Sequence, residues 1–298
     1  MAKRLLITGA NGFVAGSIVK QADASWELHA VSRGPAAFER ENLRWHTVSS
    51  FDEESLHDLF HDVEPDAVIH TAALADIDYC QANQDEAVAV NVDYTRILST
   101  LCCDHDAKMV HLSTDNVFDG EKGNYDESDP VNPVNFYGET KVRSEWAVSA
   151  SRCRAVVGRV ALVMGLPMIG AGNSFVSRMV ATLEAGRDVT APANEIRSPV
   201  DVVTLGQALL ELAGNDWTGC MHLSGSDRLS RLEMMRRIAR RLGYSESKIV
   251  AHDPASIPGR AERPRDVSLR NMKARARLKT PMVDLERGME LMLGARGF

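Results

Sequence analysis

The chain has 298 residues, of which 44% are hydrophobic and 25% charged, a composition typical of a soluble globular protein with one large domain or two joined ones. Its net charge of −7 argues against non-specific nucleic-acid binding, and no apolar run approaches the ~18 residues of a membrane span. The five cysteines show no CxxC pair and no metal-ligand spacing, which favours free thiols in a reducing cytoplasm and no metal site.

Short apolar runs alternate with helix-like stretches through the first half of the chain. We expect strands at 5–8, 28–32, 43–48, 66–73, 108–114 and 155–163. We expect helices after the first strand to about residue 21, at 52–63, at about 85–104 and from about residue 135. Strands with few polar positions that alternate with helices indicate a parallel sheet covered on both faces. The pattern therefore predicts an α/β fold with a doubly wound parallel sheet.

The regular alternation ends near Gly165, where the loop-like "PMIGAGN" (167–173) follows. Farther on, Ser230 and Glu233 have the spacing of a capping box that opens a helix. We therefore predict a sheet domain at 1–164 and a smaller C-terminal domain over most of 165–298, with some segments of the latter returning to the sheet domain.

The turn after the first strand, "ITGANGFVAG", has Gly9, Gly12 and Ala15 at three-residue intervals. A dinucleotide pyrophosphate needs backbone N–H groups and the positive end of a helix dipole, and side chains would block its approach. A small residue at position 15 lets the helix pack closely on the sheet. The turn thus predicts a dinucleotide site, with cofactor contacts at Gly9, Asn11, Gly12, Phe13 and Val14.

The end of the second strand indicates which dinucleotide binds. An acid there would take the ribose hydroxyls of NAD, whereas a basic group would accept the 2′-phosphate of NADP. Ser32 and Arg33 stand at this point, and no Asp or Glu does. Because Arg33 can make a charge-assisted bond to phosphate, the sequence predicts that NADP(H) is preferred over NAD(H).

The segment "NFYGETK" puts Tyr137 and Lys141 four residues apart, so both can point from one face of a helix. The same spacing recurs at Tyr244 and Lys248, so the spacing alone does not identify a site. The second pair follows a helix end at Gly243 and lies far from the cofactor motifs, so we interpret it as structural.

In combination, "TGANGFVA", "HTAA", "LSTDNVFDG" and "NPVNFYGETK" resemble the extended short-chain dehydrogenase/reductase family. The resemblance is greatest to the dTDP-4-dehydrorhamnose reductases and their relatives. It runs over most of the chain and includes the weaker segments at 172–175, 195–200 and 263–269. Two departures are Ala15 in place of a third glycine and the absence of an acid in "SSFD" (49–52), where the family holds the adenine.

The resemblance implies a Rossmann fold with a smaller C-terminal substrate-binding domain, and catalysis by Thr114, Tyr137 and Lys141. Tyr137 and Lys141 would also contact the cofactor. Further cofactor contacts that it implies are Ala72, Ala73, Asn91 and Val160.

Reduction of a ketone needs a hydride from the nicotinamide and a proton for the oxygen. A free tyrosine, with a pKa of about 10, is a weak acid for this purpose. An ammonium about 5 Å away at an effective dielectric near 20 favours the phenolate by roughly 3 kcal/mol, or about 2 pKa units. We therefore expect Lys141 to lower the pKa of Tyr137, and Thr114 to bond the developing alkoxide.

The expected function is NADPH-dependent reduction of a nucleotide-linked 4-keto-6-deoxysugar. A nucleotide diphosphate needs cationic partners, and the expected substrate contacts are Asp115, Asn173, Arg197 and Arg263. One alternative is a nucleotide-sugar epimerase or dehydratase, which would retain its cofactor. Another is a non-catalytic NADP-binding regulatory subunit similar to the beta subunit of methionine adenosyltransferase. A homodimer is compatible with the sequence.

Overall fold

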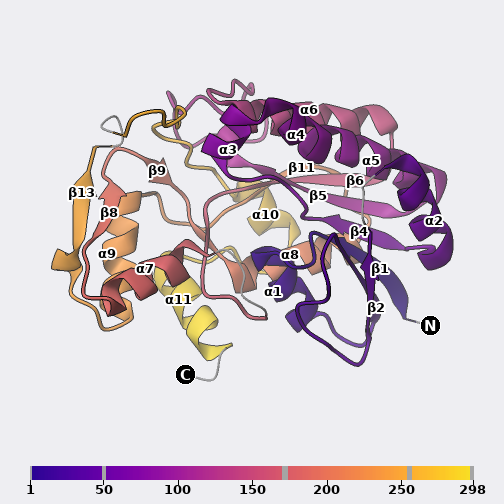
Figure 1. Cartoon of the computed structure of the whole chain (residues 1–298), viewed down its shortest axis with the longest axis horizontal. Coiled ribbons are helices and arrows are strands. Elements are labelled where there is room, and N and C mark those ends of the chain that lie inside the picture. Colours follow the sequence, from indigo (N-terminus) through magenta and orange to yellow (C-terminus); the bar gives the residue numbers. More distant parts are fainter. Residues whose placement is uncertain (1, 49–51, 170–173, 254–256, 296–298) are drawn as a thin grey trace.

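The computed structural model describes residues 2–48, 52–169, 174–253 and 257–295. Its main sheet is parallel throughout and has seven strands in the order β11-β6-β5-β4-β1-β2-β3 (Figure 1). The strands are β1 (Lys3–Thr8), β2 (Trp26–Ser32), β3 (Leu43–Thr47), β4 (Ala67–His70), β5 (Lys108–Thr114), β6 (Ala155–Val160) and β11 (Gly219–Leu223). The central strands are buried along most of their length because helices cover both faces.

Two hydrophobic clusters fill the interfaces between the sheet and the helices on its two faces. On one face lie α1 (Phe13–Gln21), α8 (Val202–Gly214) and α10 (Met272–Arg277), which contribute Ile18, Leu209 and Ala274 to the first cluster. On the other face lie α2 (Glu53–Val63), α5 (Tyr94–Asp104) and α6 (Phe136–Ser151), which contribute Phe60, Leu98 and Val148 to the second cluster (Figure 1). The predicted doubly wound α/β fold is confirmed.

A smaller part of the molecule lies beside the carboxyl ends of β5 and β6, at the left of Figure 1. A third hydrophobic cluster holds it together, with Met179, Ile238 and Met289 among its members. Its elements are α7 (Phe175–Glu184), α9 (Arg231–Arg241), α11 (Leu285–Gly294) and the paired strands β8 (Val189–Pro192) and β13 (Ile249–His252). The predicted N-cap of α9 is present, since the Ser230 hydroxyl accepts a bond of 3.1 Å from the Glu233 N–H.

The chain crosses between the two parts more than once. Short ladders join β7 (Val163–Met164) to β10 (Val200–Asp201) and β9 (Ile196–Arg197) to β12 (Leu229–Ser230). After β10 the chain returns to the sheet as α8 and then β11, which extends the sheet beyond β6. Segments after residue 165 thus complete the larger part.

Several elements differ from the sequence prediction. The helix expected at about 85–104 is divided into α4 (Gln84–Val88), a π-helical turn (Ala89–Asp93) and α5. The strand expected at 155–163 ends at Val160, and α3 (Ile77–Ala82) and a 3₁₀ turn at Asp115–Val117 were not anticipated.

Among the helices that the structure describes, none is long and apolar enough to cross a lipid bilayer.

Candidate active site

The turn between β1 and α1 forms a cradle of bare backbone. Gly9 has a φ of +68°, and a Cβ there would lie 2.7 Å from the backbone nitrogen of Ala72. Gly12 is the N-cap residue of α1 and carries no side chain that could cap the helix. The first N–H groups of α1 are therefore accessible from this turn, which is what a phosphate group requires.

A pocket of about 310 Å³ opens at this cradle. It lies at the carboxyl ends of β1, β2 and β4, where the chain order reverses on either side of β1 and where such sheets bind ligands. The sequence-predicted contacts that line it are Gly9, Asn11, Gly12, Ser32, Arg33, Ala72 and Ala73, together with Gly34, Leu74 and Val90. Phe13 and Val14 follow in the first turn of α1, partly buried and outside this lining.

The hydroxyl of Ser32 is already used within the protein. It donates to the Gly34 carbonyl at 2.7 Å and accepts bonds from Asn11 Nδ2 at 3.3 Å and Trp45 Nε1 at 3.1 Å. These bonds fix the start of the loop after β2. Arg33 is exposed at the pocket, so the guanidinium rather than the hydroxyl is the group that a 2′-phosphate could reach.

Asn91 lies in the π-helical turn and is 1% exposed. Its Oδ1 accepts from the Leu74 N–H at 2.8 Å, and its Nδ2 donates to the Leu74 carbonyl at 3.0 Å and to Thr140 Oγ1 at 3.0 Å. Both ends of the amide are engaged, so Asn91 fixes the segment that carries Ala72 and Ala73. Val160 is buried at the end of β6, in register with Thr114.

The three expected catalytic residues converge at the end of β5. Thr114 is the last residue of that strand, and Tyr137 and Lys141 lie on the buried face of α6. Asn135 caps this helix, since its Oδ1 accepts from the Gly138 N–H at 2.9 Å. A Cβ on Gly138 would overlap the Asn116 carbonyl oxygen, so glycine at this position lets α6 approach the turn after Thr114.

Burial dominates the electrostatics of this group. It raises the pKa of Tyr137, and the nearby Thr114 hydroxyl opposes this only in part. Burial also lowers the pKa of Lys141 to about 8, although Glu145 favours the charged form. The expectation that Lys141 would lower the pKa of Tyr137 is therefore wrong for this structure, because burial raises that pKa and the group that opposes the rise is the Thr114 hydroxyl.

A cluster of charged side chains is centred on Glu195. The carboxylate of Glu195, 3% exposed, is shared by Arg260 at 2.5 Å, Arg231 at 3.3 Å and Arg197 at 3.8 Å. Although burial alone would raise the pKa of Glu195, the guanidinium groups, Arg260 foremost, hold it below its usual value. We call Arg197, Arg231 and Arg260 the arginine cluster.

Asp115 connects this cluster to the catalytic group. Its Oδ2 is buried without a hydrogen bond among the described residues and lies 4.0 Å from Arg197 Nε. Burial raises the pKa of Asp115, and Arg197 opposes the shift. Arg197 is itself buried, and its Nη1 donates to the Ile196 carbonyl at 2.8 Å.

The other expected substrate contacts are placed differently. Arg263 makes a two-pronged ion pair with Asp78 of α3, at 2.5 and 2.7 Å, and so fastens the loop around residue 262 to the larger part. Asn173 lies outside the described residues, as do Ser49 and Ser50. Sequence reasoning missed Glu195, Arg231 and Arg260, because no spacing along the chain brings residues 195, 231 and 260 together.

The second tyrosine–lysine pair is structural, as interpreted. Tyr244 donates from its hydroxyl to Glu184 at 3.4 Å, and Lys248 pairs with Asp188 at 3.0 Å. Both contacts lie on the smaller part of the molecule, between α7 and the segment after α9. The pair is thus separate from the pocket and from Thr114.

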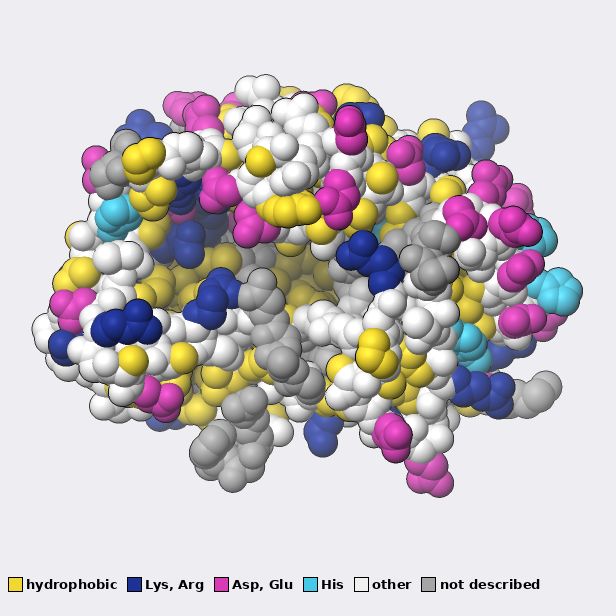
Figure 2. All heavy atoms as spheres, viewed as in Figure 1, with side chains coloured by type: hydrophobic (Ala, Val, Ile, Leu, Met, Phe, Trp, Pro, Cys, Tyr) yellow, Lys and Arg dark blue, Asp and Glu magenta, His cyan; other side chains and the backbone are white. Residues whose placement is uncertain are grey.

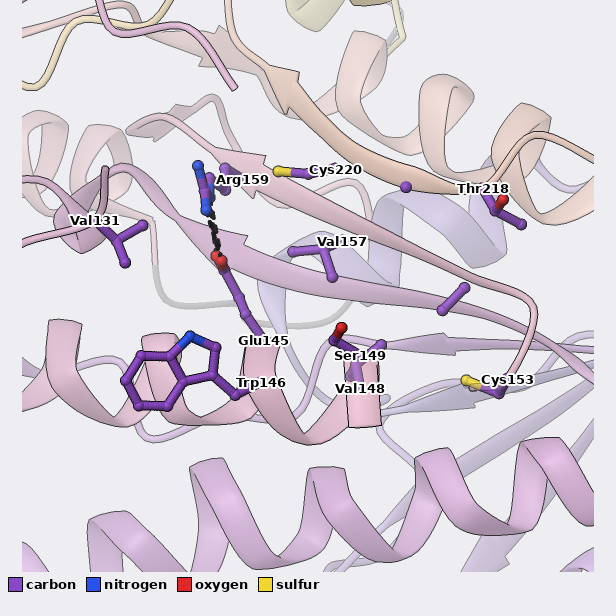
Figure 3. Close-up of a pocket in the computed structure, with 12 residues that line it drawn as sticks. Val131, Glu145, Trp146, Val148, Ser149, Cys153, Val157, Arg159, Thr218 and Cys220 are labelled. Atoms are coloured by element: carbon purple, nitrogen blue, oxygen red, sulfur yellow. Dashed lines mark hydrogen bonds and ion pairs between the residues drawn. The ribbon is translucent and has the colours of Figure 1, made fainter. Parts of the chain in front are cut away.

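A further pocket of about 450 Å³ lies between α6, β6 and β11 (Figure 3). Glu145 of α6 and Arg159 of β6 meet there in a buried ion pair of 2.8 Å, and Trp146 stands at the rim. The lining of this pocket includes none of the sequence-predicted site residues. The space-filling view shows a hollow in the middle of the face that is turned to the viewer, with Lys and Arg side chains on either side of it (Figure 2).

The chain is similar over most of its length to known proteins. The family model described as RmlD substrate binding domain matches residues 3–296. The chain is 29% identical over 273 residues to methionine adenosyltransferase 2 subunit beta of Bos taurus, covering 90% of this chain and 80% of that protein. It is 28% identical over 293 residues to the dTDP-4-dehydrorhamnose reductase of Mycolicibacterium smegmatis, covering 97% and 85%.

Among solved structures, dTDP-4-dehydrorhamnose reductase from Bacillus anthracis in complex with NADP superimposes with a TM-score of 0.87. The sequence identity is 22%, and the match covers 98% of this chain and 99% of that one, so the fold is the same. Since the family model spans nearly the whole chain, the expectation from the sequence motifs is confirmed: this protein belongs to the RmlD substrate binding domain family.

Proposed function

We propose that this protein is an NADPH-dependent reductase of a nucleotide-linked 4-keto-6-deoxysugar. The observation that carries the proposal is the convergence of Thr114, Tyr137 and Lys141 at the sheet edge that also holds the glycine cradle. Membership of the RmlD substrate binding domain family and the similarity to dTDP-4-dehydrorhamnose reductases support it.

The residues around the cradle fit a dinucleotide. Gly9 and Gly12 bring backbone without side chains to the pocket, and Ala72 and Ala73 add small, apolar side chains to its lining. Arg33 is exposed at the pocket and no acid ends β2, which favours NADP(H) over NAD(H). When bound, the nicotinamide would supply the hydride.

Tyr137 is the proton donor in this proposal. Because burial raises its pKa, its hydroxyl stays protonated at neutral pH and can give a proton to the substrate oxygen. Lys141, with a pKa of about 8, is mostly charged at neutral pH and would stabilise the phenolate left behind. Thr114 would turn its hydroxyl from Asp115, to which it donates at 3.1 Å, toward the substrate oxygen.

The arginine cluster is the proposed diphosphate site. Its three guanidinium groups share one buried carboxylate, Glu195, and an anion would add the acceptors that such a group of donors needs. Arg231 and Arg260 are more exposed than Arg197, so we assign the direct contacts to them. The smaller part, mainly residues 165–298, would then be the substrate-binding domain.

The cellular setting is the cytoplasm in this proposal. The structure has all five cysteines as free thiols. A protein of this size whose thiols stay unpaired fits a reducing compartment.

The direct test is loss of NADPH absorbance with a panel of dTDP- and UDP-linked 4-keto-6-deoxysugars. Turnover of the nucleotide sugars but not of the free sugars is expected, because binding energy from the nucleotide orients the ketone. Activity on simple ketones alone would point to a different reductase, and interconversion of nucleotide sugars without added NADPH would point to an epimerase or dehydratase.

A non-catalytic subunit is the second candidate function. It is favoured by the 29% identity to methionine adenosyltransferase 2 subunit beta over 90% of this chain. Tight NADPH binding, no turnover across the panel and a stable complex with a methionine adenosyltransferase would together select this candidate over the reductase.

A further inference from the structure

The segment at residues 260–263 connects the two parts of the molecule. It follows β13 of the smaller part and precedes α10, and on the way it touches α3 and the start of α6 in the larger part (Figure 1). These four residues form neither helix nor strand. Their position therefore depends on the bonds that they make with other elements.

Asp78 of α3 makes three of these bonds. Its Oδ1 accepts from the Ala261 N–H at 2.8 Å and from Arg263 Nη1 at 2.5 Å, and its Oδ2 accepts from Arg263 Nη2 at 2.7 Å. The side chain of Arg263 is 12% exposed and that of Asp78 49%. The bond from Arg263, foremost, holds the pKa of Asp78 below its usual value, so this carboxylate is charged at neutral pH.

The start of α6 makes a further bond with the segment. Asn135 Nδ2 donates to the Glu262 carbonyl at 3.0 Å, while Asn135 Oδ1 caps α6. Asn135 is buried, and Tyr137 follows two residues later. The segment is thus bonded to the same helix start that carries the proposed proton donor.

Arg260, at the beginning of the segment, is bonded to the smaller part. Its Nη2 donates to Glu195 Oε1 at 2.5 Å, and Arg231 Nη1 donates to the other oxygen of this carboxylate at 3.3 Å. The next residue, Ala261, is bonded to Asp78. The side chain of Arg260 is therefore fixed by the smaller part and the backbone beside it by the larger part.

We propose that Asp78 is a positioning residue of the diphosphate site: it locks residues 260–263 through Ala261 and Arg263, and the locked segment holds Arg260 where a nucleotide diphosphate can bind. Without the lock, the ligand would first have to order the segment, which lowers its affinity. The class of ligand rests on the proposed function, whereas the lock itself does not.

A direct contact from Arg263 to the substrate, as predicted from the sequence, would have the opposite consequence. The carboxylate of Asp78 would then compete with the diphosphate for the same guanidinium, and removal of the carboxylate would strengthen anion binding. The two roles of Arg263 are thus distinguished by the direction in which Asp78→Ala changes the affinity.

The first test needs no ligand. Amide hydrogen exchange of the full chain, followed by NMR, reports on the Ala261 N–H. We expect faster exchange in Asp78→Ala, because this N–H loses its acceptor, and an intermediate rate in Asp78→Asn, which keeps a side-chain oxygen. Asp85→Ala is the matched control, since it removes an exposed acid from the first turn of α4 just as Asp78 stands in the first turn of α3.

Asp85→Ala should keep the wild-type exchange rate at Ala261. An equal rate at Ala261 in the wild type and Asp78→Ala would overturn the lock.

The second test measures the binding of dTDP and of UDP by calorimetry, with NADP⁺ present. Asp78→Ala should raise the Kd of whichever nucleotide the wild type binds by at least about 5-fold, and Asp85→Ala should leave it unchanged. In the Arg260→Ala background, Asp78→Ala should change the Kd by less than about 2-fold, because the lock acts through Arg260. Equal NADP⁺ affinity of all variants shows that they are folded.

Three results would overturn the proposal. Tighter nucleotide binding in Asp78→Ala would assign Arg263 a direct contact instead. An Asp78→Ala effect that is just as large without Arg260 would show that Asp78 acts by another route. A wild type that binds neither dTDP nor UDP would leave no diphosphate site to position.

The lock and the proposed reductase can fail separately. A wild type that turns over no nucleotide sugar but shows the expected losses of dTDP or UDP affinity would contradict the reductase and leave the lock standing. Turnover with a KM that neither Asp78→Ala nor Arg260→Ala changes would contradict the positioning role while the reductase stands.

Discussion

At the scale of single residues, burial affects the pKa values of Tyr137 and Lys141 more than any neighbouring group does. Tyr137 and Lys141 are both buried, and each is shifted toward its neutral form: the pKa of the tyrosine rises and that of the lysine falls to about 8. A pair in this state keeps the tyrosine proton until a substrate oxygen can receive it. Proton transfer is then tied to substrate binding.

The first prediction isolates the proton donor. Tyr137→Phe should abolish turnover and leave NADPH affinity nearly unchanged, because the substitution removes only the hydroxyl. Tyr244→Phe, the matched change in the structural pair, should retain turnover. Steady-state kinetics and fluorescence titration measure both; more than about a tenth of wild-type kcat in Tyr137→Phe, a loss below roughly 1.4 kcal/mol, would exclude the role.

The second prediction concerns cofactor choice. NADPH should bind at least about 10-fold more tightly than NADH, since a charge-assisted phosphate contact is worth about 1.5–3 kcal/mol. Arg33→Ala should remove most of that preference by weakening NADPH binding alone. Titration of both cofactors against both proteins gives the answer, and an unchanged preference in Arg33→Ala would contradict the assignment.

The third prediction follows from the buried lysine. Its folded pKa of about 8 lies below the unfolded value of 10.5, so between these pH values the unfolded chain binds more protons. Burial of the charged lysine therefore lowers the free energy of unfolding below pH 8. This cost disappears as the pH rises towards 10.5, so the free energy of unfolding rises across the window. Lys141→Met should remove the rise and stabilise the protein below pH 8 by up to about 3 kcal/mol.

Urea unfolding of the cofactor-free protein at several pH values measures this contribution. Lys248→Met removes an exposed lysine instead and should keep the wild-type dependence. Equal pH dependence in the wild type and Lys141→Met would show that Lys141 is not depressed.

At the scale of elements, the approach of α6 to the end of β5 builds the site. Gly138 sits between the two catalytic side chains of the helix, against the Asn116 carbonyl. The glycine has little helix propensity, so its place here reflects the close contact and not the helix itself. Thr114 comes from the sheet, and Tyr137 can reach it only because α6 lies close to the end of β5.

The fourth prediction tests that contact. Gly138→Ala should push α6 away from the turn after Thr114, with a loss of about 1–3 kcal/mol of stability and a fall in kcat. Gly294→Ala, at the end of α11 with open space around the new Cβ, should be neutral or slightly stabilising. Denaturant midpoints and kinetics of the two variants decide it, and equal stability of both would show that the approach is not tight.

At the scale of the whole molecule, the candidate site lies between the two parts. Asp115 follows β5 of the sheet, whereas Glu195, Arg231 and Arg260 come from the smaller part. Arg263 with Asp78 forms a second link between the two. A nucleotide sugar bound at the arginine cluster would therefore reach the catalytic group from the smaller part.

The fifth prediction belongs to this scale. Arg260→Ala should raise KM for the nucleotide sugar about 10-fold or more with a smaller effect on kcat, because a charged contact to the diphosphate is lost. Arg240→Ala removes an exposed arginine that pairs with Glu246 and should change neither constant. A KM in Arg260→Ala equal to that of the wild type would place the diphosphate elsewhere.

The sequence by itself determined the parallel sheet, the glycine cradle and the tyrosine–lysine face. Each of these depends on residues close together in the chain: an apolar run, a turn of glycines, a spacing of four in one helix. Local sterics and periodicity are sufficient to fix such features. The π-helical turn at Asn91 was not predicted, because the Asn91 amide bonds Leu74 and Thr140, which are distant in sequence.

Only the tertiary structure decided which charges meet and how far each side chain is removed from water. Glu195 gathers arginines from positions 197, 231 and 260, and Arg263 is drawn to Asp78 instead of the expected substrate site. The pKa of Tyr137 rises because the packing of α6 on the sheet removes water from the phenol. Loss of hydration depends on every neighbour in space, so it follows from the assembled fold and not from the spacing of two residues.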